Sequence, residues 1–390
     1  MFGRLRTGAP VLGPLSRSFG FHAVCLLAAV ASCGNDDSTR LPAHGTGGNG
    51  LEGCAVPRGS ALHGHVAVSS ALAPCRITLQ SSGITLKIDE NGDGPDAVPP
   101  ILRLASGTFV AASSERDRLT TWLVNGEPDR VVGRTGIGPG EFRRVSAVYV
   151  DFSDTVHVSD APGRWIVFNS VLEHVRTTSS PSFAVTESAA FLNDGNLLLA
   201  PPNLTVDRRV FHVVDRHNPQ SIRGFGTLAG GSLEGAMQIA YSNGRTFWAA
   251  SPTKYVLEHW SLDGQRIGSI ERRVPWFIAS DSGLLAQGTP RIIRLRADNS
   301  GTLWVTIRVP DASRRPLPSD PLRTRTLGLR VEVFSTATGE LLASEFYQDQ
   351  YEPPFGFFSD SQGYRIRPAE SGIFRVEVVD YRLVKAAPTS

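Results

Sequence analysis

Apolar and polar residues alternate along most of the chain that follows Cys75, as they do in β-strands that bury one face. β-Branched and aromatic residues are frequent in these runs, and clusters of Gly, Asp, Asn and Ser separate one run from the next. No window keeps a helical period for long, and the nearest one, "TESAAFL", is short. The pattern therefore predicts an all-β protein.

One unit recurs along the chain: a tight turn that contains Gly or Asp, followed by an apolar strand. The turn residues of its six copies are Gly107, Asp154, Gly195, Gly244, Gly301 and Gly363. A second alternating strand follows each copy, as "RWIVFN" follows the second. Glycine suits such turns because it adopts a positive φ without a steric clash. Six units of roughly 40 to 60 residues predict a six-bladed β-propeller of four-stranded antiparallel blades.

The last of these blades is one strand short at the C-terminus, where the chain ends soon after "IFRVEVVDYRLV". The segment Cys75 to Asp89, "CRITLQSSGITLKID", precedes the first blade and has the pattern of a strand. Open sheet edges invite misassembly. We therefore expect this segment to complete the last blade and so to close the ring.

The stretch "GRTGIGPGEF", residues 133–142, has four glycines but lies between two strand patterns. A phosphate-binding loop needs a helix behind it, so that amide donors and the helix dipole point at the anion. The stretch also lacks GxxxxGK[ST], and Glu141 stands where G-x-G-x-x-G requires its last glycine. We interpret it as the crossing from the first blade to the second, with Phe142 packed between them.

The residues from this crossing to Asn169, "GIGPGEFRRVSAVYVDFSDTVHVSDAPGRWIVFN", resemble NHL-type six-bladed propellers of bacterial envelope lipoproteins. The matches to the family's G-x-G-P-G-x-F crossing are Gly136, Gly138, Pro139, Gly140 and Phe142. The matches to its V-x-D step and R-I-x-V-F strand are Val158, Asp160, Arg164, Ile166, Val167 and Phe168. Asp154 replaces the usual turn glycine. The resemblance implies a propeller fold and says little about function.

The N-terminus has the pattern of an export signal. A basic stretch precedes "GFHAVCLLAAVASC", an apolar run too short to span a bilayer but suited to the core of a signal peptide. Its end, "VASC", resembles the lipobox of bacterial lipoproteins, in which the cysteine is acylated and becomes the first mature residue. The resemblance implies lipidation at Cys33. The alternative is an ordinary secretory signal, with Cys33 near the cut by chance.

These patterns divide the chain into a lipoprotein signal peptide (1–32), a flexible Gly/Ser-rich tether (33–74) and a propeller (75–390). We expect an exported protein that is lipid-anchored in the bacterial cell envelope, at the inner or the outer membrane. Once the signal and Cys33 are accounted for, Cys54 and Cys75 remain. An even pair in an oxidising compartment predicts one disulfide, and the pair lacks the spacing of a metal site.

Charge and motifs narrow the function classes. The chain has 39 Lys and Arg against 37 Asp and Glu, a net charge of +2, which does not suit a nucleic-acid partner. Neither G-x-S-x-G nor H-E-x-x-H occurs. A metal enzyme of this shape would gather acids at the central channel, and the candidates are Asp151, Glu187, Asp298 and Asp360.

Acids beside turns ordinarily cap the turn, so no catalytic residue is assigned. No cofactor is predicted, and a divalent ion in the central channel is left open. Asp160 and Arg164 are interpreted as a pair that holds a turn of the second blade. The isolated histidines His157, His212 and His259 lie within strand patterns and are interpreted as structural residues.

Successive turns of a four-strand meander alternate between two faces, so the long connections share the face opposite the glycine turns. The longest is "VPDASRRPLPSDPLRTRT", Val309 to Thr326. Its candidate ligand-binding residues, which suit anionic groups, are Arg314, Arg315, Arg323 and Arg325. We predict a non-catalytic envelope lipoprotein that binds a protein, peptide or glycan. The alternative is an exported propeller enzyme: a metal-dependent hydrolase or lactonase, a lyase or a quinone-dependent dehydrogenase.

Overall fold

The structure, a computed structural model, describes residues 53–57, 59–70, 72–87, 100–113, 117–161, 163–179, 188–201, 209–215, 218, 221–227, 237–241, 244–278, 289–310, 327–348, 356–368 and 374–386. The chain divides into two compact units, Met1–Asn49 and Gly50–Ser390, and every described residue belongs to the second. The regular elements described are all strands, and none of this part of the chain forms a helix long and apolar enough to cross a membrane.

Four of the five sheets are built on four consecutive antiparallel strands. Sheet I comprises β3 (Leu102–Arg103), β4 (Phe109–Ser113), β5 (Arg118–Trp122) and β6 (Pro128–Val132). Sheet II comprises β7 (Val145–Val150), β8 (Val156–Asp160), β9 (Arg164–Phe168) and β10 (His174–Ser179). Sheet III comprises β11 (Ala189–Phe191), β12 (Leu197–Leu199), β13 (Arg209–Val214) and β14 (Ile222–Thr227). Sheet IV comprises β15 (Gln238–Ala240), β16 (Thr246–Ala250), β17 (Val256–Ser261) and β18 (Arg266–Arg272), with β1 (Gly64–Val68) added outside β18.

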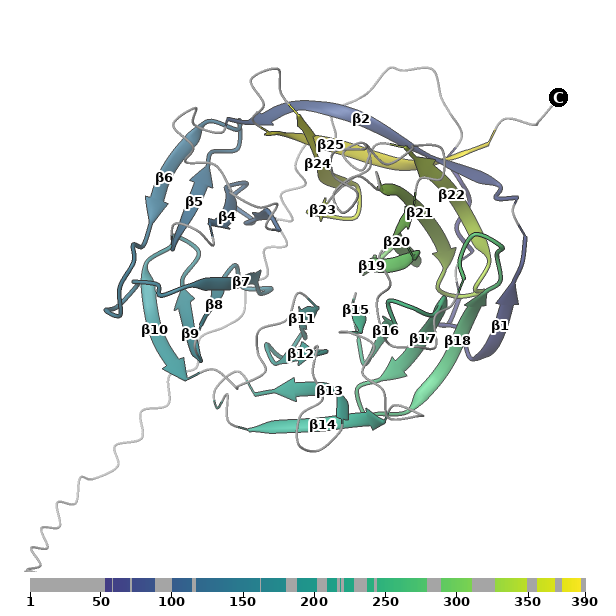
Figure 1. Cartoon of the computed structure of the whole chain (residues 1–390), viewed down its shortest axis with the longest axis horizontal. Coiled ribbons are helices and arrows are strands. Elements are labelled where there is room, and N and C mark those ends of the chain that lie inside the picture. The colour runs from purple at the N-terminus through teal and green to yellow at the C-terminus, as the bar shows by residue number, and fades with distance from the viewer. Residues whose placement is uncertain are drawn as a thin grey trace, which may run out of the picture. The chain divides into compact units, whose positions relative to one another are not determined.

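The fifth sheet has eight strands in two halves. Half V comprises β19 (Arg291–Ala297), β20 (Thr302–Pro310), β21 (Leu327–Ser335) and β22 (Leu341–Tyr347). Half VI comprises β23 (Gly356–Phe357), β24 (Gln362–Pro368), β25 (Phe374–Lys385) and β2 (Cys75–Leu86). One parallel residue pair, Cys75 with Ala343, joins β2 to β22. The sheets have a propeller-like arrangement (Figure 1), which confirms the prediction of an all-β, propeller-like fold. The expected six separate sheets number five, because the last one has eight strands.

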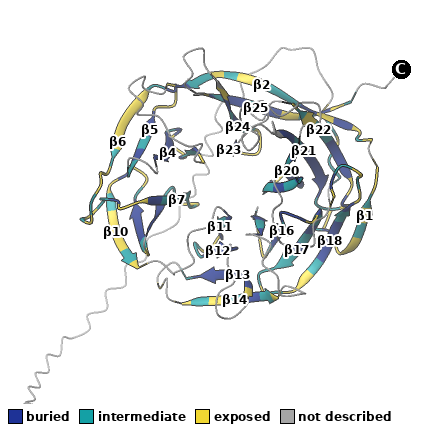
Figure 2. Cartoon of the chain, in the orientation of Figure 1, coloured by how far each residue is buried: buried dark blue, intermediate teal, exposed yellow. Residues whose placement is uncertain are grey.

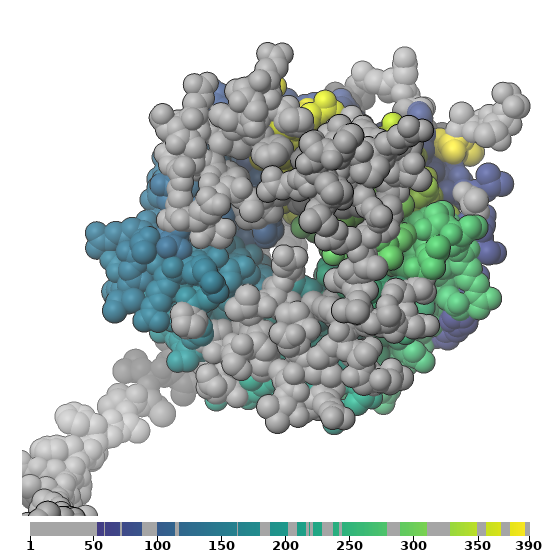
Figure 3. All heavy atoms as spheres, in the orientation of Figure 1, coloured from purple at the N-terminus to yellow at the C-terminus, as the bar shows by residue number. Residues whose placement is uncertain are grey.

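Hydrophobic side chains fill the space between consecutive four-strand groups, and each such contact is called a seam below. Seam I/II contains Phe142, II/III Trp165, III/IV Phe211, IV/V Tyr255, V/VI Trp304 and VI/I Trp122. The outer strands β6, β10 and β14 expose many residues, whereas the strands inside them are mostly buried (Figure 2). The atoms of sheets I and II form one continuous mass, in blue, on the left of the space-filling view (Figure 3).

The tight turns take the predicted residues in five of the six copies. Gly107, Asp154, Gly195, Gly244 and Gly301 all have a positive φ, and Asp154 reaches 60° as the aspartate substitute for glycine. The sixth copy differs: Gly363 lies within β24, where a side chain would collide with the backbone oxygen of Gly356. Gly363 therefore serves a close backbone approach rather than a turn.

Strand β2 closes the arrangement as predicted. It pairs antiparallel with β25 from Cys75 opposite Lys385 to Leu86 opposite Val376, and the two strands run side by side in Figure 1. Leu86, at the end of β2, then packs with Trp122 of sheet I in seam VI/I. Cys75 and Ile77, at its start, pack with Tyr381 of β25 in seam V/VI. Closure pairs the edge that the C-terminal strand would otherwise leave open.

The boundary expected at residue 75 needs a correction. Residues 64–68, predicted to belong to a flexible tether, form β1, which pairs in parallel with β18. Leu62 and Val66 pack against the seam IV/V cluster, and the Leu62 amide donates to the Thr336 carbonyl at 2.8 Å. Burial of these side chains orders a segment whose composition alone suggested a linker. The part of the tether before residue 53 lies outside the described residues.

The first and third turns of each group share one face, called the turn face. Third-turn amides donate to first-turn carbonyls in sheet IV and half V: Leu262 to Arg245 at 2.8 Å and Thr336 to Gly301 at 2.9 Å. In half VI the amide of Tyr381, within β25, donates to the first-turn carbonyl of Ser361 at 2.8 Å. First turns of neighbouring groups are also bonded, as when the Ala105 amide donates to the Asp154 carboxylate at 2.7 Å. The opposite face, which receives the second turns and the crossings, is called the connection face.

Candidate functional site

The glycine-rich stretch is a crossing and not a phosphate cradle. It leads into strand β7, and its ends are bonded to each other, since the Phe142 amide donates to the Arg134 carbonyl at 2.9 Å. The Glu141 carboxylate accepts from the Gly138 amide at 2.8 Å and from Arg134 Nε at 2.8 Å. A side chain at Gly136 would collide with that carboxylate. The Gly138 amide, followed by Arg134, holds the pKa of Glu141 below its usual range.

Phe142 lies fully buried in seam I/II, as the sequence predicted. The crossing is thus packed by its own residues and by an aromatic side chain. Gly138 and Pro139 belong to this stretch, and Gly140 has a φ of 70°. The amides of Gly136 and Gly138, which would have to point at an anion, donate within the chain to Phe142 and Glu141.

Asp160 and Arg164 brace the crossing from sheet II. Asp160 Oδ1 accepts from the amides of Arg143 at 2.8 Å and Arg144 at 2.6 Å, and Arg164 Nη1 lies 3.2 Å from Asp160 Oδ2. The Arg164 guanidinium also donates to the carbonyls of Gly136 at 3.3 Å and Glu141 at 3.2 Å. The pair therefore holds both the β8–β9 turn and the crossing, which agrees with its structural interpretation.

His157 makes a buried dyad with Asp151. Trp165 Nε1 donates to His157 Nδ1 at 3.2 Å, so His157 Nε2 carries the proton and donates to Asp151 Oδ2 at 3.1 Å. Burial lowers the pKa of His157, and the Asp151 carboxylate opposes that shift. Because both ring nitrogens are occupied, this dyad stabilises sheet II and offers no vacant base.

The first turn of half V repeats the arrangement with a tryptophan. Asp298 accepts from the Thr302 amide at 2.9 Å and from Trp304 Nε1 at 3.1 Å, in the same spacing as Asp151, Thr155 and the ring of His157. Asp360 accepts from Arg296 at 3.0 Å and from the Asn299 amide at 3.3 Å.

The acids considered as metal ligands are therefore turn caps or arginine partners wherever they are described, and Glu187 lies outside the described residues. Within the described ranges, no three or more His, Cys, Asp or Glu residues are grouped closely enough to hold a metal ion. His212 and His259 are buried in β13 and β17, and the His259 ring stacks on Trp248 with centroids 4.7 Å apart. Burial likewise lowers the pKa of His259.

One buried polar network was not anticipated from the sequence. Arg272 Nε and Nη2 donate to the two Glu332 oxygens at 2.9 and 3.1 Å, and the Tyr255 hydroxyl donates to Glu332 at 2.6 Å. Arg272 also donates to the carbonyls of Val68 at 3.2 Å and Ser70 at 2.7 Å, which ties the segment after β1 to seam IV/V. Burial, followed by the Glu332 charge, raises the pKa of Tyr255 well above its usual value.

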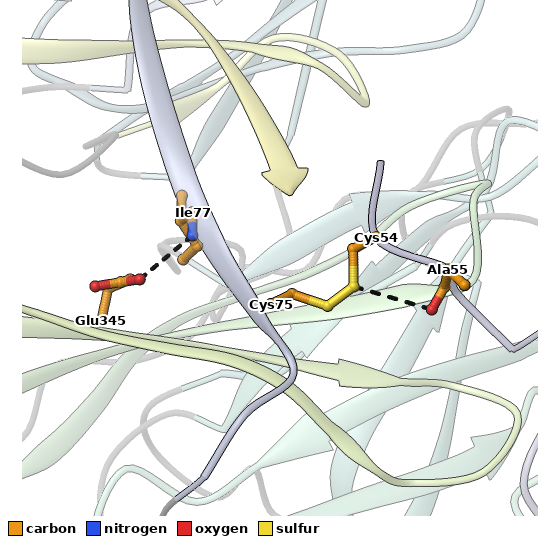
Figure 4. Close-up of a disulfide and its surroundings, with 5 residues drawn as sticks. All are labelled: Cys54, Ala55, Cys75, Ile77 and Glu345. Atoms are coloured by element: carbon orange, nitrogen blue, oxygen red, sulfur yellow. Dashed lines mark hydrogen bonds between the residues drawn. A yellow bond between two sulfur atoms is a disulfide. The ribbon is translucent and has the colours of Figure 1, made fainter. Parts of the chain in front are cut away.

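The predicted disulfide is present. Cys54 and Cys75 are bonded with their Cα atoms 5.9 Å apart (Figure 4). The Cys54 amide donates to the Leu383 carbonyl at 3.1 Å. Beside it, the Ile77 amide donates to Glu345 Oε1 at 3.4 Å. The cross-link closes the loop that carries β1 around the outside of half V.

Two sets of predicted site residues lie outside the described residues. One is Cys33, the predicted lipidation site. The other is the arginine set Arg314, Arg315, Arg323 and Arg325. The connection that carries these arginines leaves β20 at Pro310 and enters β21 at Leu327, which fixes both its ends on the connection face of half V.

Comparison with known proteins supports the fold only. No family model matches the chain, and no curated protein matches it. A Bacteroides fragilis protein described as exported aligns with a TM-score of 0.56 and 14% identity, over 83% of this chain and 99% of that one. A DUF4221 family member from Bacteroides vulgatus aligns with a TM-score of 0.60 and 11% identity, over 80% of this chain and 99% of that one. At such identities the likeness establishes a shared propeller-like fold and not a shared activity.

Proposed function

We propose that this protein is an exported, lipid-anchored propeller that binds a protein, peptide or glycan of the bacterial cell envelope and catalyses no reaction on it. We further propose six blades of the NHL-like type, with halves V and VI counted as two. Six seams, each with its own hydrophobic cluster, support that count, and the crossing motif of residues 136–142 supports the type.

The difference between the two faces carries the proposal of binding. The turn face consists of short turns that are bonded within and between groups, for example Asn193 to Tyr241 at 3.3 Å. The second turns and the crossings, which include the longest connection in the chain, all belong to the connection face. Loops on a rigid scaffold are the usual place for recognition, so the ligand is proposed to bind at the connection face.

Export and anchoring rest on the signal pattern and the disulfide, since disulfides persist in oxidising compartments. Mass spectrometry of the mature N-terminus tests the anchor. We expect a chain that begins at a diacylated Cys33, and Cys33→Ser should release the protein from membranes. A free amine at any other residue, without acyl mass, contradicts the anchor.

Crosslinking and pull-down of the anchored protein from its own envelope tests the binding function. The variant with Arg314, Arg315, Arg323 and Arg325 all changed to serine should lose most of the captured partner. Arg245→Ser, on the turn face, should retain it. Equal capture by a folded quadruple variant and by the wild type would exclude this connection as the binding surface.

A further inference from the structure

Half V and half VI bring arginines together at the connection-face end of seam V/VI. The residues are Arg291 and Arg294 of β19, Arg308 of β20, Arg365 and Arg367 of β24 and Arg375 of β25. None of them was singled out by the sequence patterns above, and none takes part in the networks of the previous sections. Each is partly or fully exposed, so solvent and small solutes reach it.

Strand alternation places Arg291, Arg294 and Arg308 of half V on the side that faces half VI. Trp304 belongs to the seam V/VI cluster, and Arg308 lies four residues further along β20, on the same side of the strand. Arg291 pairs with Arg308 and Arg294 pairs with Thr306, so Arg291 and Arg294 share that side. Leu295 and Ile292 belong to the seam IV/V cluster and point the other way.

The same argument places the arginines of half VI. Tyr381 packs in seam V/VI, and Glu377 and Arg375 lie four and six residues from it along β25, on the same side. Arg365 pairs with Glu377 and Arg367 pairs with Arg375. Tyr364 and Ile366, between them on β24, pack in seam VI/I instead.

The two arginine-bearing ends meet at one end of the seam. Trp304 and Tyr381 are in contact, with ring centroids 4.9 Å apart, close to the turn face. From that contact, β20 towards Arg308 and β25 towards Arg375 both lead to the connection face, since β20 continues to Pro310 and β25 begins at Phe374. The seam is therefore aromatic at the turn face and basic at the connection face.

Negative charge at this end is scarce. Among the described residues on these two sides, the acids are Glu345 and Glu377. Glu377 accepts from Arg365 Nε at 2.7 Å, and Arg367 Nε lies 3.7 Å away. The side chains of Arg291 and Arg375 have no ion-pair partner within the described part of the chain. Among the described residues, arginines thus outnumber carboxylates at this end, and Arg294 and Arg308 keep further contacts of their own.

Two of the cross-strand pairs are pairs of arginines: Arg291 opposite Arg308, and Arg367 opposite Arg375. Like charges directly opposite each other on a sheet are destabilising. Natural sequences break such local rules chiefly at functional sites. Guanidinium groups bind carboxylate and phosphate oxygens with two parallel hydrogen bonds, which lysine does not offer.

We propose that the connection-face end of seam V/VI binds a ligand that carries at least two carboxylate or phosphate groups, one between the arginines of half V and one between those of half VI. The proposal deepens the binding function proposed above, because it names the chemistry of the ligand and the groups that hold it. It concerns binding of an anion by the folded chain and does not depend on Cys33.

The test uses the purified full chain, with citrate as the tricarboxylate probe and pyrophosphate as the phosphate probe, in titration calorimetry at constant ionic strength. The wild type should bind at least one of them, and the tighter probe identifies the acidic group. In Arg291→Gln/Arg375→Gln, which removes one member of each pair, the Kd should rise at least tenfold.

The free protein supplies a second readout. Because each substitution removes a like-charge contact, the melting temperature of the double variant without ligand should stay constant or rise by about 1–2 °C. A purely structural role of these arginines would lower it. Should the double variant fail to fold, Arg291→Lys/Arg375→Lys keeps the charge, and its Kd should still rise severalfold because the paired hydrogen bonds are lost.

The control is Arg245→Gln/Arg266→Gln, which removes the same charge from sheet IV at exposed arginines paired with Asp263 and Glu258. Its Kd should match that of the wild type. The proposal is overturned if neither probe binds the wild type, or if the control weakens binding as much as the seam variant. A failed pull-down with intact anion binding would count against the envelope partner and leave this site standing.

Discussion

Seams I/II and V/VI both join neighbouring four-strand groups, but they differ in the charged residues that lie opposite each other. In seam I/II the buried Asp160 carboxylate meets Arg164 and two backbone amides, so one acid and one base are matched and the crossing is fixed around them. In the connection-face end of seam V/VI, arginines lie opposite arginines at two pairs. The first seam is complete by itself, whereas the second is the one that we propose an added anion completes.

Seam IV/V belongs with the first kind. Arg272 and Glu332 are almost fully buried and bonded through both carboxylate oxygens, and Tyr255 satisfies the same carboxylate. The buried charges of Asp160, Arg272 and Glu332 are thus paired, as the cost of leaving a buried charge unmatched demands. The paired arginines of seam V/VI lie at partly exposed positions, where water lowers the cost of placing like charges side by side. The contrast distinguishes the scaffold from the proposed binding site.

Removal of β2 should give the largest effect, because it breaks seam V/VI itself. Deletion of residues 76–89 removes the buried side chains of Ile77 and Leu86, and it exposes the residues that pack against them and the edge of β25. Burial of Ile77 and Leu86 alone contributes about 3–6 kcal/mol to stability. Urea unfolding should show a loss of at least that size. Arg76→Ser/Gln80→Ser, at exposed β2 positions, is the control and should change little. An unchanged unfolding midpoint after the deletion would contradict closure by β2.

Asp160→Ala should leave the positive charge of Arg164 in seam I/II without its carboxylate partner. The change leaves Arg164 and the amides of Arg143 and Arg144 without their acceptor at a buried position, which should cost about 3 kcal/mol. Asp129→Ala, at a half-exposed ion pair with Arg130, should cost under about 0.5 kcal/mol. Denaturant titration of both variants is the measurement. Similar small losses in the two would mean that Asp160 does not balance the seam.

Arg375→Glu should replace one arginine–arginine pair of seam V/VI with an acid–base pair. It places an acid opposite Arg367 and should raise the stability of the free protein by about 0.5–1 kcal/mol while it weakens anion binding. Arg382→Glu makes the same charge change on the exposed part of β25 and should do neither. Unfolding and calorimetry on both variants give the answer. A loss of stability in Arg375→Glu would show that the arginine pair is not in conflict.

Acidification should produce the smallest effect, and should act on His157 rather than on the arginines. Since burial lowers the pKa of His157 below the usual 6.5, the unfolded chain binds the proton more readily, and stability falls as pH drops below that value. Arginines keep their charge throughout this range. Unfolding at about pH 7.5 and about pH 5.5 should show a smaller pH dependence in His157→Gln than in the wild type. An equal dependence in both would place the titrating group elsewhere, with His259 as the next candidate because burial also lowers its pKa.

Much of the fold follows from local chemistry that the sequence displays. Turn residues with positive φ at Gly107, Asp154 and Gly301 are specified by backbone sterics, and strand alternation is specified by burial of one face. The interpretation of the crossing also rested on local facts, namely a strand after the glycines and Glu141 in place of a glycine. The assignment of Gly363 to a turn was wrong because "DSQG" has the composition of a turn, whereas the pairing of β24 with β23 places Gly363 inside the strand.

The candidate site was less accessible to sequence reasoning. "RIIRLRA" does display three arginines in one strand, and that signal was available. Which side of the sheet they occupy depends on the irregularity between Ile292 and Arg294, because a one-residue shift moves every following side chain to the other face. The ordered β1 was hidden for a similar reason, since its partner β18 lies some two hundred residues away along the chain, beyond any local pattern.

The sequence alone therefore determined the strands other than β1, the turns other than that at Gly363, the disulfide pair and the closing segment, because each of these follows from neighbouring residues or from simple counting. The tertiary structure alone decided which charges meet: Arg272 with Glu332, and Arg291 with Arg308 beside Arg367 with Arg375. These contacts between charged residues depend on strand register, on β-bulges and on the packing of one sheet against the next. Such relations join residues far apart in the chain, and the free energy that fixes them appears only when the seams are formed.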